Sequence, residues 1–108
     1  MNHFDAVIIG SGQAAPSLAV GLANRGQSVA LIEGDKLGGT CVNSGCTPTK
    51  TLRKSARVAH MVRRAADFGV STGAVTVDFP AAMSRMRERV DTARRGLTAW
   101  LKRTKGVE

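Results

Sequence analysis

An apolar run passes directly into a glycine-rich turn in Ala6-Val7-Ile8-Ile9-Gly10-Ser11-Gly12-Gln13-Ala14-Ala15. The apolar run is mostly β-branched and stops at glycine, which predicts a buried parallel strand. A helical pattern follows the turn to about residue 26, and a second apolar strand at 28–32 ends in Glu33. This order of strand, turn, helix and strand predicts the start of a doubly wound α/β fold, with a βαβ unit over residues 1–34.

The glycine turn has the spacing of a dinucleotide-binding motif. Gly10 permits the tight turn, Gly12 lets a pyrophosphate approach the backbone, and Ala15 is small enough for close packing of the helix on the strand. The unpaired N–H groups at the helix start favour phosphate. Glu33 is placed to accept hydrogen bonds from a ribose, and Pro16 is tolerated because it falls in the first helical turn. The alternative is a doubly wound domain that binds no nucleotide.

Both cysteines lie in a second glycine-rich stretch, Gly38-Gly39-Thr40-Cys41-Val42-Asn43-Ser44-Gly45-Cys46-Thr47-Pro48-Thr49-Lys50. Four residues separate the thiols, which suits a pair that closes into a small ring on the first turn of a helix. The positive end of the helix dipole favours thiolate, and therefore redox chemistry.

Other interpretations of the two cysteines are a metal site, an iron–sulfur site and inert buried thiols. His3 and His60 have no ligand spacing with the pair, and the iron–sulfur pattern lacks two further cysteines. We therefore expect no metal site.

The stretch from Gly39 to Lys50 resembles the active-site signature of the FAD-dependent pyridine nucleotide-disulfide oxidoreductases. It is most similar to mercuric reductases and mercuric-reductase-like proteins, with dihydrolipoamide dehydrogenases next. The resemblance implies a flavoprotein in which NADPH or NADH reduces FAD, the flavin opens a Cys41–Cys46 disulfide, and the dithiol reduces an acceptor such as Hg(II) or a disulfide substrate.

The same resemblance implies a role for each matching residue. Cys41 and Cys46 would be the catalytic pair, with the Cys46 thiolate beside the flavin and Cys41 meeting the substrate. Lys50, one helical turn after Cys46, would lie beside the flavin ring. Neither His3 nor His60 matches the family's base, so no general acid or base is assigned. The full set of predicted cofactor-binding residues is Gly10, Ser11, Gly12, Ala14, Ala15, Glu33, Gly38, Gly39, Thr40, Gly45 and Lys50.

Two long helices are expected after the glycine turn. Residues 38–68 would form a redox-disulfide loop and a helix from Cys46 to about Asp67, followed by a glycine stop at Gly69. Residues 75–77 are either a short strand or extended chain. Asp78 would cap a second helix at 79–103 that packs on its own domain rather than on a coiled-coil partner. The predicted core stripes are Leu52, Ala56, Ala59, Val62 and Ala66 on the first helix, and Met83, Met86, Val90, Ala93, Leu97 and Trp100 on the second.

The expected architecture is therefore a Rossmann-like βαβ start of a FAD-binding domain followed by two long helices. At 108 residues the chain is one domain's worth. Residues 106–108 read as a turn toward a further strand, and the resemblance implies NAD(P) and dimerisation domains that are absent before Glu108. We expect a truncated amino-terminal portion of a protein that is a homodimer when intact. Residues 1–108 alone should be inactive, hold FAD weakly and aggregate.

Charge is distributed unevenly along the chain. The net charge is +8, and thirteen basic residues oppose five acidic ones after residue 50. This leaves a different class of function open, a non-catalytic nucleotide-binding remnant or a basic-helix module that binds a partner. Nucleic acid is not the expected partner, because charged helix faces are usually only solvated. No apolar run approaches the roughly 18 residues of a membrane span, so we expect a cytoplasmic protein without a membrane partner.

Overall fold

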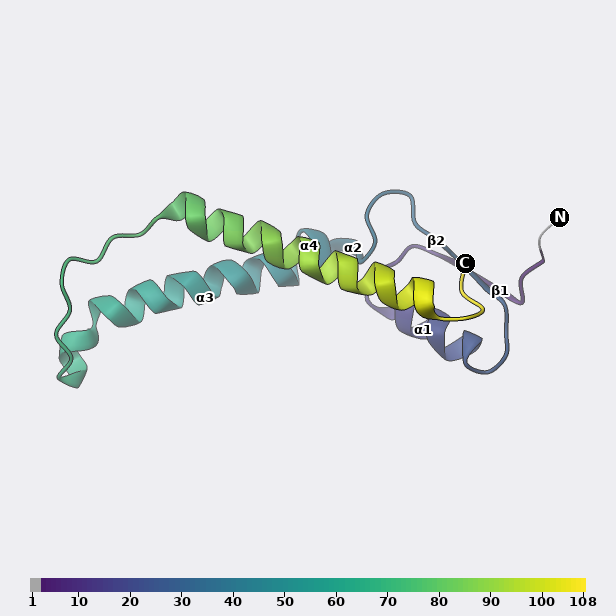
Figure 1. Cartoon of the computed structure of the whole chain (residues 1–108), viewed down its shortest axis with the longest axis horizontal. Coiled ribbons are helices and arrows are strands. Elements are labelled where there is room, and N and C mark those ends of the chain that lie inside the picture. The colour runs from purple at the N-terminus through teal and green to yellow at the C-terminus, as the bar shows by residue number, and fades with distance from the viewer. Residues whose placement is uncertain (1–2) are drawn as a thin grey trace.

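The chain folds into a small α/β unit from which two long helices extend. The structure, a computed structural model, describes residues 3–108. Its elements are β1 (Ala6–Ile9), α1 (Ala14–Ala23), β2 (Val29–Ile32), α2 (Gly39–Asn43), α3 (Cys46–Arg63), the short 3-10 helix η1 (Ala65–Phe68) and α4 (Phe79–Arg103) (Figure 1). The predicted α/β class, with a βαβ start and two long helices, is confirmed.

The two strands are parallel, with Ala6 opposite Val29 and α1 as the connection between them. The end of the chain joins this sheet beside β2. Val29 N–H donates to the Gly106 carbonyl at 2.8 Å, and Glu108 N–H donates to the Val29 carbonyl at 2.9 Å. Val107 thus forms an isolated parallel bridge with Val29, which agrees with the predicted turn toward a strand at residues 106–108.

A small core lies between α1 and one face of the sheet. Ala19 and Val29 are fully inaccessible there, and Ile8 and Leu31 pack against them. Alanine on the helix lets its backbone come close to the strands, so few large side chains are needed to fill the space.

The opposite face of the sheet is open among the described residues. Val7 is 58% exposed, Ile9 85% and Ile32 52%. The prediction that the first strand is buried is therefore wrong for residues 3–108. Successive strand residues face opposite sides, and α1 covers only one of those sides.

Helices α3 and α4 run antiparallel and make the molecule elongated. It measures 67 × 24 × 18 Å and has a radius of gyration of 20.0 Å, against about 13 Å for a compact chain of this length. In Figure 1 the loop between the two helices forms the far tip, and the end of α4 returns beside α1. The start of α3 therefore lies where the antiparallel pair α3 and α4, the helical hairpin, meets the α/β unit.

Helix α4 begins and packs largely as predicted. The Asp78 side chain accepts a hydrogen bond from Ala81 N–H at 2.9 Å, which confirms the cap. Val90 is buried, but Trp100 is 37% exposed and Leu101 takes the inner position at 6% exposure. The residues of the predicted stripe recur at slightly less than one helical turn, so the stripe moves gradually around α4. Leu101 lies about five full turns after Met83 and is therefore on the same side of the helix as Met83.

Helix α3 ends earlier than predicted, at Arg63, and η1 carries the chain to Gly69, whose φ of 73° ends it. Residues 75–77 are extended chain without strand pairing. Two residues of the predicted α3 stripe, Ala56 and Ala66, are exposed. No helix among residues 3–108 is both long and apolar enough to cross a bilayer.

Two polar residues of α3, Thr51 and Ser55, also contact α4. The Arg85 guanidinium donates to the Thr51 carbonyl at 3.2 Å and to the Ser55 hydroxyl at 3.4 Å. The α3–α4 contact is therefore partly polar, which hydrophobic periodicity does not reveal.

Candidate redox site

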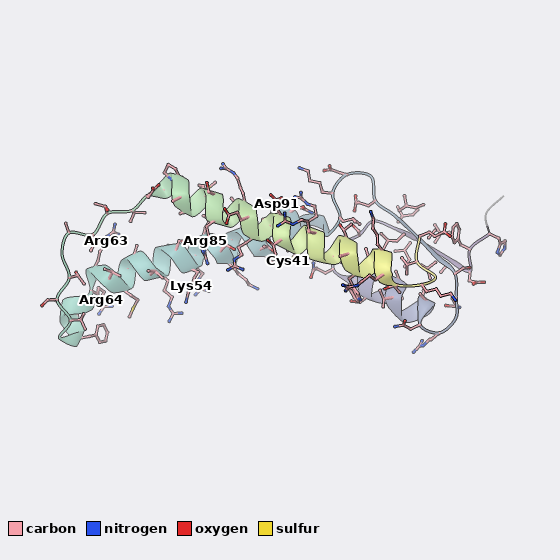
Figure 2. All side chains as sticks on the ribbon, in the orientation of Figure 1. Cys41, Lys54, Arg63, Arg64, Arg85 and Asp91 are labelled. Atoms are coloured by element: carbon pink, nitrogen blue, oxygen red, sulfur yellow. A yellow bond between two sulfur atoms is a disulfide. The ribbon has the colours of Figure 1, made fainter. Side chains whose placement is uncertain are left out.

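The two cysteines meet where α2 turns into α3. Cys41 and Cys46 form a disulfide with their Cα atoms 4.6 Å apart. Cys41 is half-buried on α2, and Cys46 is exposed as the first residue of α3. Figure 2 places Cys41 in the region where α2, α3 and α4 meet.

Gly45 makes this close meeting possible. A Cβ atom at residue 45 would lie 3.0 Å from the Thr40 carbonyl oxygen and 3.3 Å from Cys41 Cα. The same Thr40 carbonyl accepts a hydrogen bond from Ser44 N–H at 2.9 Å and so closes α2. The residue between the helices must therefore be glycine for the cysteines to sit this close without rearrangement.

The signature segment, residues 38–50, is docked on the glycine turn after β1. Gly39 has φ of 62°, and a Cβ atom there would lie 2.8 Å from Gly12 Cα. Gly38 has φ of 105°, and its Cβ would strike the side chain of Val42. Two backbones separated by 27 residues in sequence are thus in direct contact.

Ser11 ties this contact to the end of β2. Its side chain is 1% exposed, and its hydroxyl donates to a Glu33 carboxylate oxygen at 2.5 Å while accepting from Gly38 N–H at 3.0 Å. Ser11 N–H donates to the same Glu33 oxygen at 3.0 Å, and Asp35 N–H donates to the other at 3.0 Å. The N–H group and the hydroxyl of Ser11 are therefore both hydrogen-bonded within the chain.

These hydrogen bonds favour the ionised form of Glu33. The Ser11 hydroxyl contributes most to lowering the pKa of Glu33, followed by the N–H groups of Asp35 and Ser11. Glu33 is thus a carboxylate at neutral pH, and its oxygens retain lone pairs for a ribose hydroxyl.

Asn43 is a site residue that sequence reasoning missed. Its amide nitrogen donates to the carbonyls of Leu37 and Gly39, at 3.0 and 2.9 Å, and lies 3.3 Å from that of Lys36. Its oxygen accepts from the Arg94 guanidinium on α4 at 3.0 Å. Asn43 lies between the cysteines and so could be suspected, but nothing in the sequence links it to a residue 51 positions later.

The glycine turn fits the phosphates of a dinucleotide. A Cβ atom at Gly10 or Gly12 would meet nothing within 4 Å, so space is open over the turn. No residue in the range 3–108 accepts a hydrogen bond from the N–H groups of Gly12, Gln13 or Ala14. These donors lie at the start of α1, where helix geometry favours an anion.

The start of α3 carries positive potential. No acidic residue occurs in α3, and Lys50 is exposed one turn after Cys46. A Cys46 thiolate would therefore be stabilised by the helix N-terminus and by a nearby cation. Within residues 3–108, no group of three or more His, Cys, Asp or Glu is placed to hold a metal ion.

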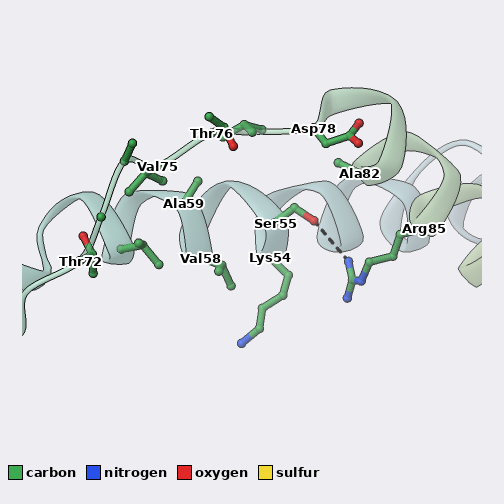
Figure 3. Close-up of a pocket in the computed structure, with 14 residues that line it drawn as sticks. Lys54, Ser55, Val58, Ala59, Thr72, Val75, Thr76, Asp78, Ala82 and Arg85 are labelled. Atoms are coloured by element: carbon green, nitrogen blue, oxygen red, sulfur yellow. Dashed lines mark hydrogen bonds between the residues drawn. The ribbon is translucent and has the colours of Figure 1, made fainter.

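An apolar groove beside α3 lies apart from this chemistry. It measures about 650 Å³ and runs between α3 and residues 72–78, with Ser55, Val75 and Arg85 on its walls (Figure 3). None of its lining residues belongs to the signature segment.

Residues 4–108 match the family described as pyridine nucleotide-disulphide oxidoreductase. The chain belongs to this family. Among the pyridine nucleotide-disulphide oxidoreductases, it is similar to dihydrolipoyl dehydrogenases. It is 41% identical over 98 residues to a dihydrolipoyl dehydrogenase of Bacillus subtilis, covering 89% of this chain and 21% of the relative. It is 40% identical over 107 residues to a dihydrolipoyl dehydrogenase of Acholeplasma laidlawii, covering 98% of this chain and 32% of the relative.

A solved member of the same kind has a similar structure. The Cu(II) complex of the HOCl-induced flavoprotein disulfide reductase RclA from Escherichia coli superposes with a TM-score of 0.75 at 37% identity, covering all of this chain and 21% of that chain. The chain thus spans between a fifth and a third of the length of these proteins. Its fold corresponds to the amino-terminal part of a flavoprotein reductase.

Proposed function

We propose that this chain forms the cofactor-binding front of a flavin-dependent disulfide oxidoreductase. In this proposal electrons from NADPH or NADH reach the Cys41–Cys46 disulfide through FAD and leave to an acceptor. The observation that carries it is the disulfide itself, which opens α3 and is docked through Gly39 on the glycine turn at Gly12. A phosphate-binding turn and a redox pair therefore lie in one small region.

Family membership and the fit of the glycine turn support FAD as the cofactor. Gly10 and Gly12 would let the pyrophosphate approach, and the N–H groups of Gln13 and Ala14 would donate to it. FAD, when bound, supplies a carrier of two electrons between the nicotinamide and the disulfide. Glu33 would accept from the ribose, while Ser11 would hold Glu33 in place rather than contact the cofactor.

Reduction by two electrons and two protons converts the disulfide to a dithiol. We assign Cys46 to the cofactor side, because it shares a face of α3 with Lys50. Cys41 then attacks a sulfur of the acceptor disulfide, forming a mixed disulfide and releasing one acceptor thiol. Cys46 thiolate attacks Cys41 sulfur, which closes the ring again and releases the second thiol.

The acceptor in this proposal is a disulfide or Hg(II), which would take the same two electrons to become Hg(0). The similarity of residues 39–50 to mercuric reductases supports the second choice, and the dihydrolipoyl dehydrogenase relatives support the first. We further propose that the intact protein is a homodimer.

The test is a reductive titration of the flavin-containing protein. Addition of two electrons should produce a long-wavelength charge-transfer absorption from thiolate to flavin. Cys46→Ser should abolish this absorption. Cys41→Ser cannot form the disulfide, so the Cys46 thiolate should give the absorption already before reduction, and two electrons should then reduce the flavin and remove it.

Ser44→Ala is the matched control, because Ser44 lies between the cysteines and carries no thiol. It should leave the absorption unchanged. A protein that binds flavin but gives no charge-transfer absorption after reduction, with both cysteines intact, would contradict the proposal.

A further inference from the structure

One side chain of α4 reaches the signature segment. Arg94 lies near the middle of α4, where this helix passes α2 (Figure 1), and its Nε donates to the side-chain oxygen of Asn43 at 3.0 Å. Among the hydrogen bonds of residues 3–108, this is the one that joins α4 to residues 38–50. The Arg94 side chain is 31% exposed, so water competes for it only in part.

Asn43 passes this contact on to the backbone around α2. It is the last residue of α2, and its amide nitrogen donates to the carbonyls of Leu37 and Gly39, so the side chain closes the helix back on the loop before it. A guanidinium can only donate, so Arg94 requires the oxygen of Asn43 on its side and leaves the nitrogen for the carbonyls. A helix of five residues gains little stability from its own hydrogen bonds, so its position depends on such contacts.

The two cysteines lie on different helices, so closure of the disulfide depends on how α2 sits beside the start of α3. Cys41 belongs to α2, two residues before Asn43, whereas Cys46 is the first residue of α3. Freedom of α2 to move lowers the effective concentration of one thiol at the other. A hydrogen bond that restrains α2 therefore favours the disulfide over the dithiol.

We propose that Arg94 is a positioning residue for the redox pair: acting through Asn43, it holds α2 where Cys41 and Cys46 close into the disulfide. This inference rests on the proposed function, in which the pair opens and closes in each reaction cycle. No hydrogen bond joins Arg94 to either cysteine within residues 3–108. Arg94 therefore sets the balance between disulfide and dithiol and carries no electrons itself.

The experiment equilibrates the intact, flavin-containing protein with mixtures of oxidised and reduced dithiothreitol. Alkylation of free thiols followed by mass spectrometry then gives the reduced fraction of the Cys41–Cys46 pair. Arg94→Met keeps most of the length of the side chain but has no donor. It should raise the equilibrium constant for reduction by about three- to tenfold, the range that one hydrogen bond supplies. A tenfold change corresponds to a reduction potential that is less negative by about 30 mV.

Two control variants separate this role from a general effect on stability. Arg95→Met removes the same charge from the next residue, whose guanidinium contacts Thr92 on α4 itself. Asp78→Ala loosens the first turn of α4 without removing a contact to residues 38–50. Both should leave the equilibrium constant within about twofold of the natural value. Arg94→Lys can still donate to the Asn43 oxygen and should recover most of the shift.

The double variant N43A/R94M should shift the equilibrium no further than N43A alone, because Arg94 acts through Asn43. Three results would overturn the inference and leave the proposed function standing: an R94M protein that matches the natural one, an equal shift in D78A, or shifts that simply add in the double variant. Failure of both NADPH and NADH to open the disulfide of the natural, flavin-containing protein would overturn the proposed function, and the inference with it.

Discussion

Replacing Gly39 with alanine should destabilise the protein through a backbone contact. The added Cβ would lie 2.8 Å from Gly12 Cα, and no side-chain rotation can relieve a clash with backbone. Because φ is 62°, any residue with a Cβ at this position raises the free energy of the folded state by about 1–2 kcal/mol. Forcing the two segments apart adds about 1–3 kcal/mol, as for other overpacked sites. The free energy of unfolding should therefore fall by about 2–5 kcal/mol.

Gly26→Ala is the matched control. Gly26 has φ of 86°, but a Cβ there would meet nothing within 4 Å. It carries the backbone penalty without the clash, so it should lose only about 1–2 kcal/mol. Urea unfolding followed by circular dichroism, with an unchanged m value, measures both variants. If Gly39→Ala is no less stable than Gly26→Ala, the contact between the signature segment and the glycine turn does not constrain the fold.

Three further substitutions probe the supports of the site. Asn43→Ala leaves three carbonyls and the Arg94 guanidinium without their partner and should cost about 1–3 kcal/mol of unfolding free energy, whereas Arg94→Lys should cost less. Asp78→Ala removes the α4 cap and should cost about 1 kcal/mol in urea unfolding; an effect within error would show that the cap is dispensable. The lowered pKa of Glu33 stabilises the fold above the unfolded value of about 4.3 and ceases to do so as pH falls through the folded value. Stability should therefore decline below about pH 4.3 in the natural protein and less steeply in Glu33→Gln; equal slopes would contradict the assignment.

Much of the redox site could be predicted because its signals are local. The βαβ order, the glycine turn, the helix beginning at Cys46 and the Asp78 cap each depend on a few adjacent residues. The five-residue helix α2 was not predicted, since it has no apolar period and is held by long-range contacts such as that of Asn43 with Arg94.

Some predictions of burial were wrong for a related reason. Periodicity identifies an apolar face but not what covers it, so Ile9 is exposed where the described residues supply no second layer. It also does not fix the rotation of a long helix, and Leu101 rather than Trp100 became the buried residue.

The sequence by itself determined the class of fold and the chemistry at the start of α3, because turn, strand and helix propensities and the spacing of two thiols are properties of neighbouring residues. Only the tertiary structure decided that Gly39 rests on Gly12 and that Ser11 bonds to Glu33 and Gly38. These facts join residues far apart in the chain, and a contact between distant residues is set by the packing of whole elements rather than by any local pattern.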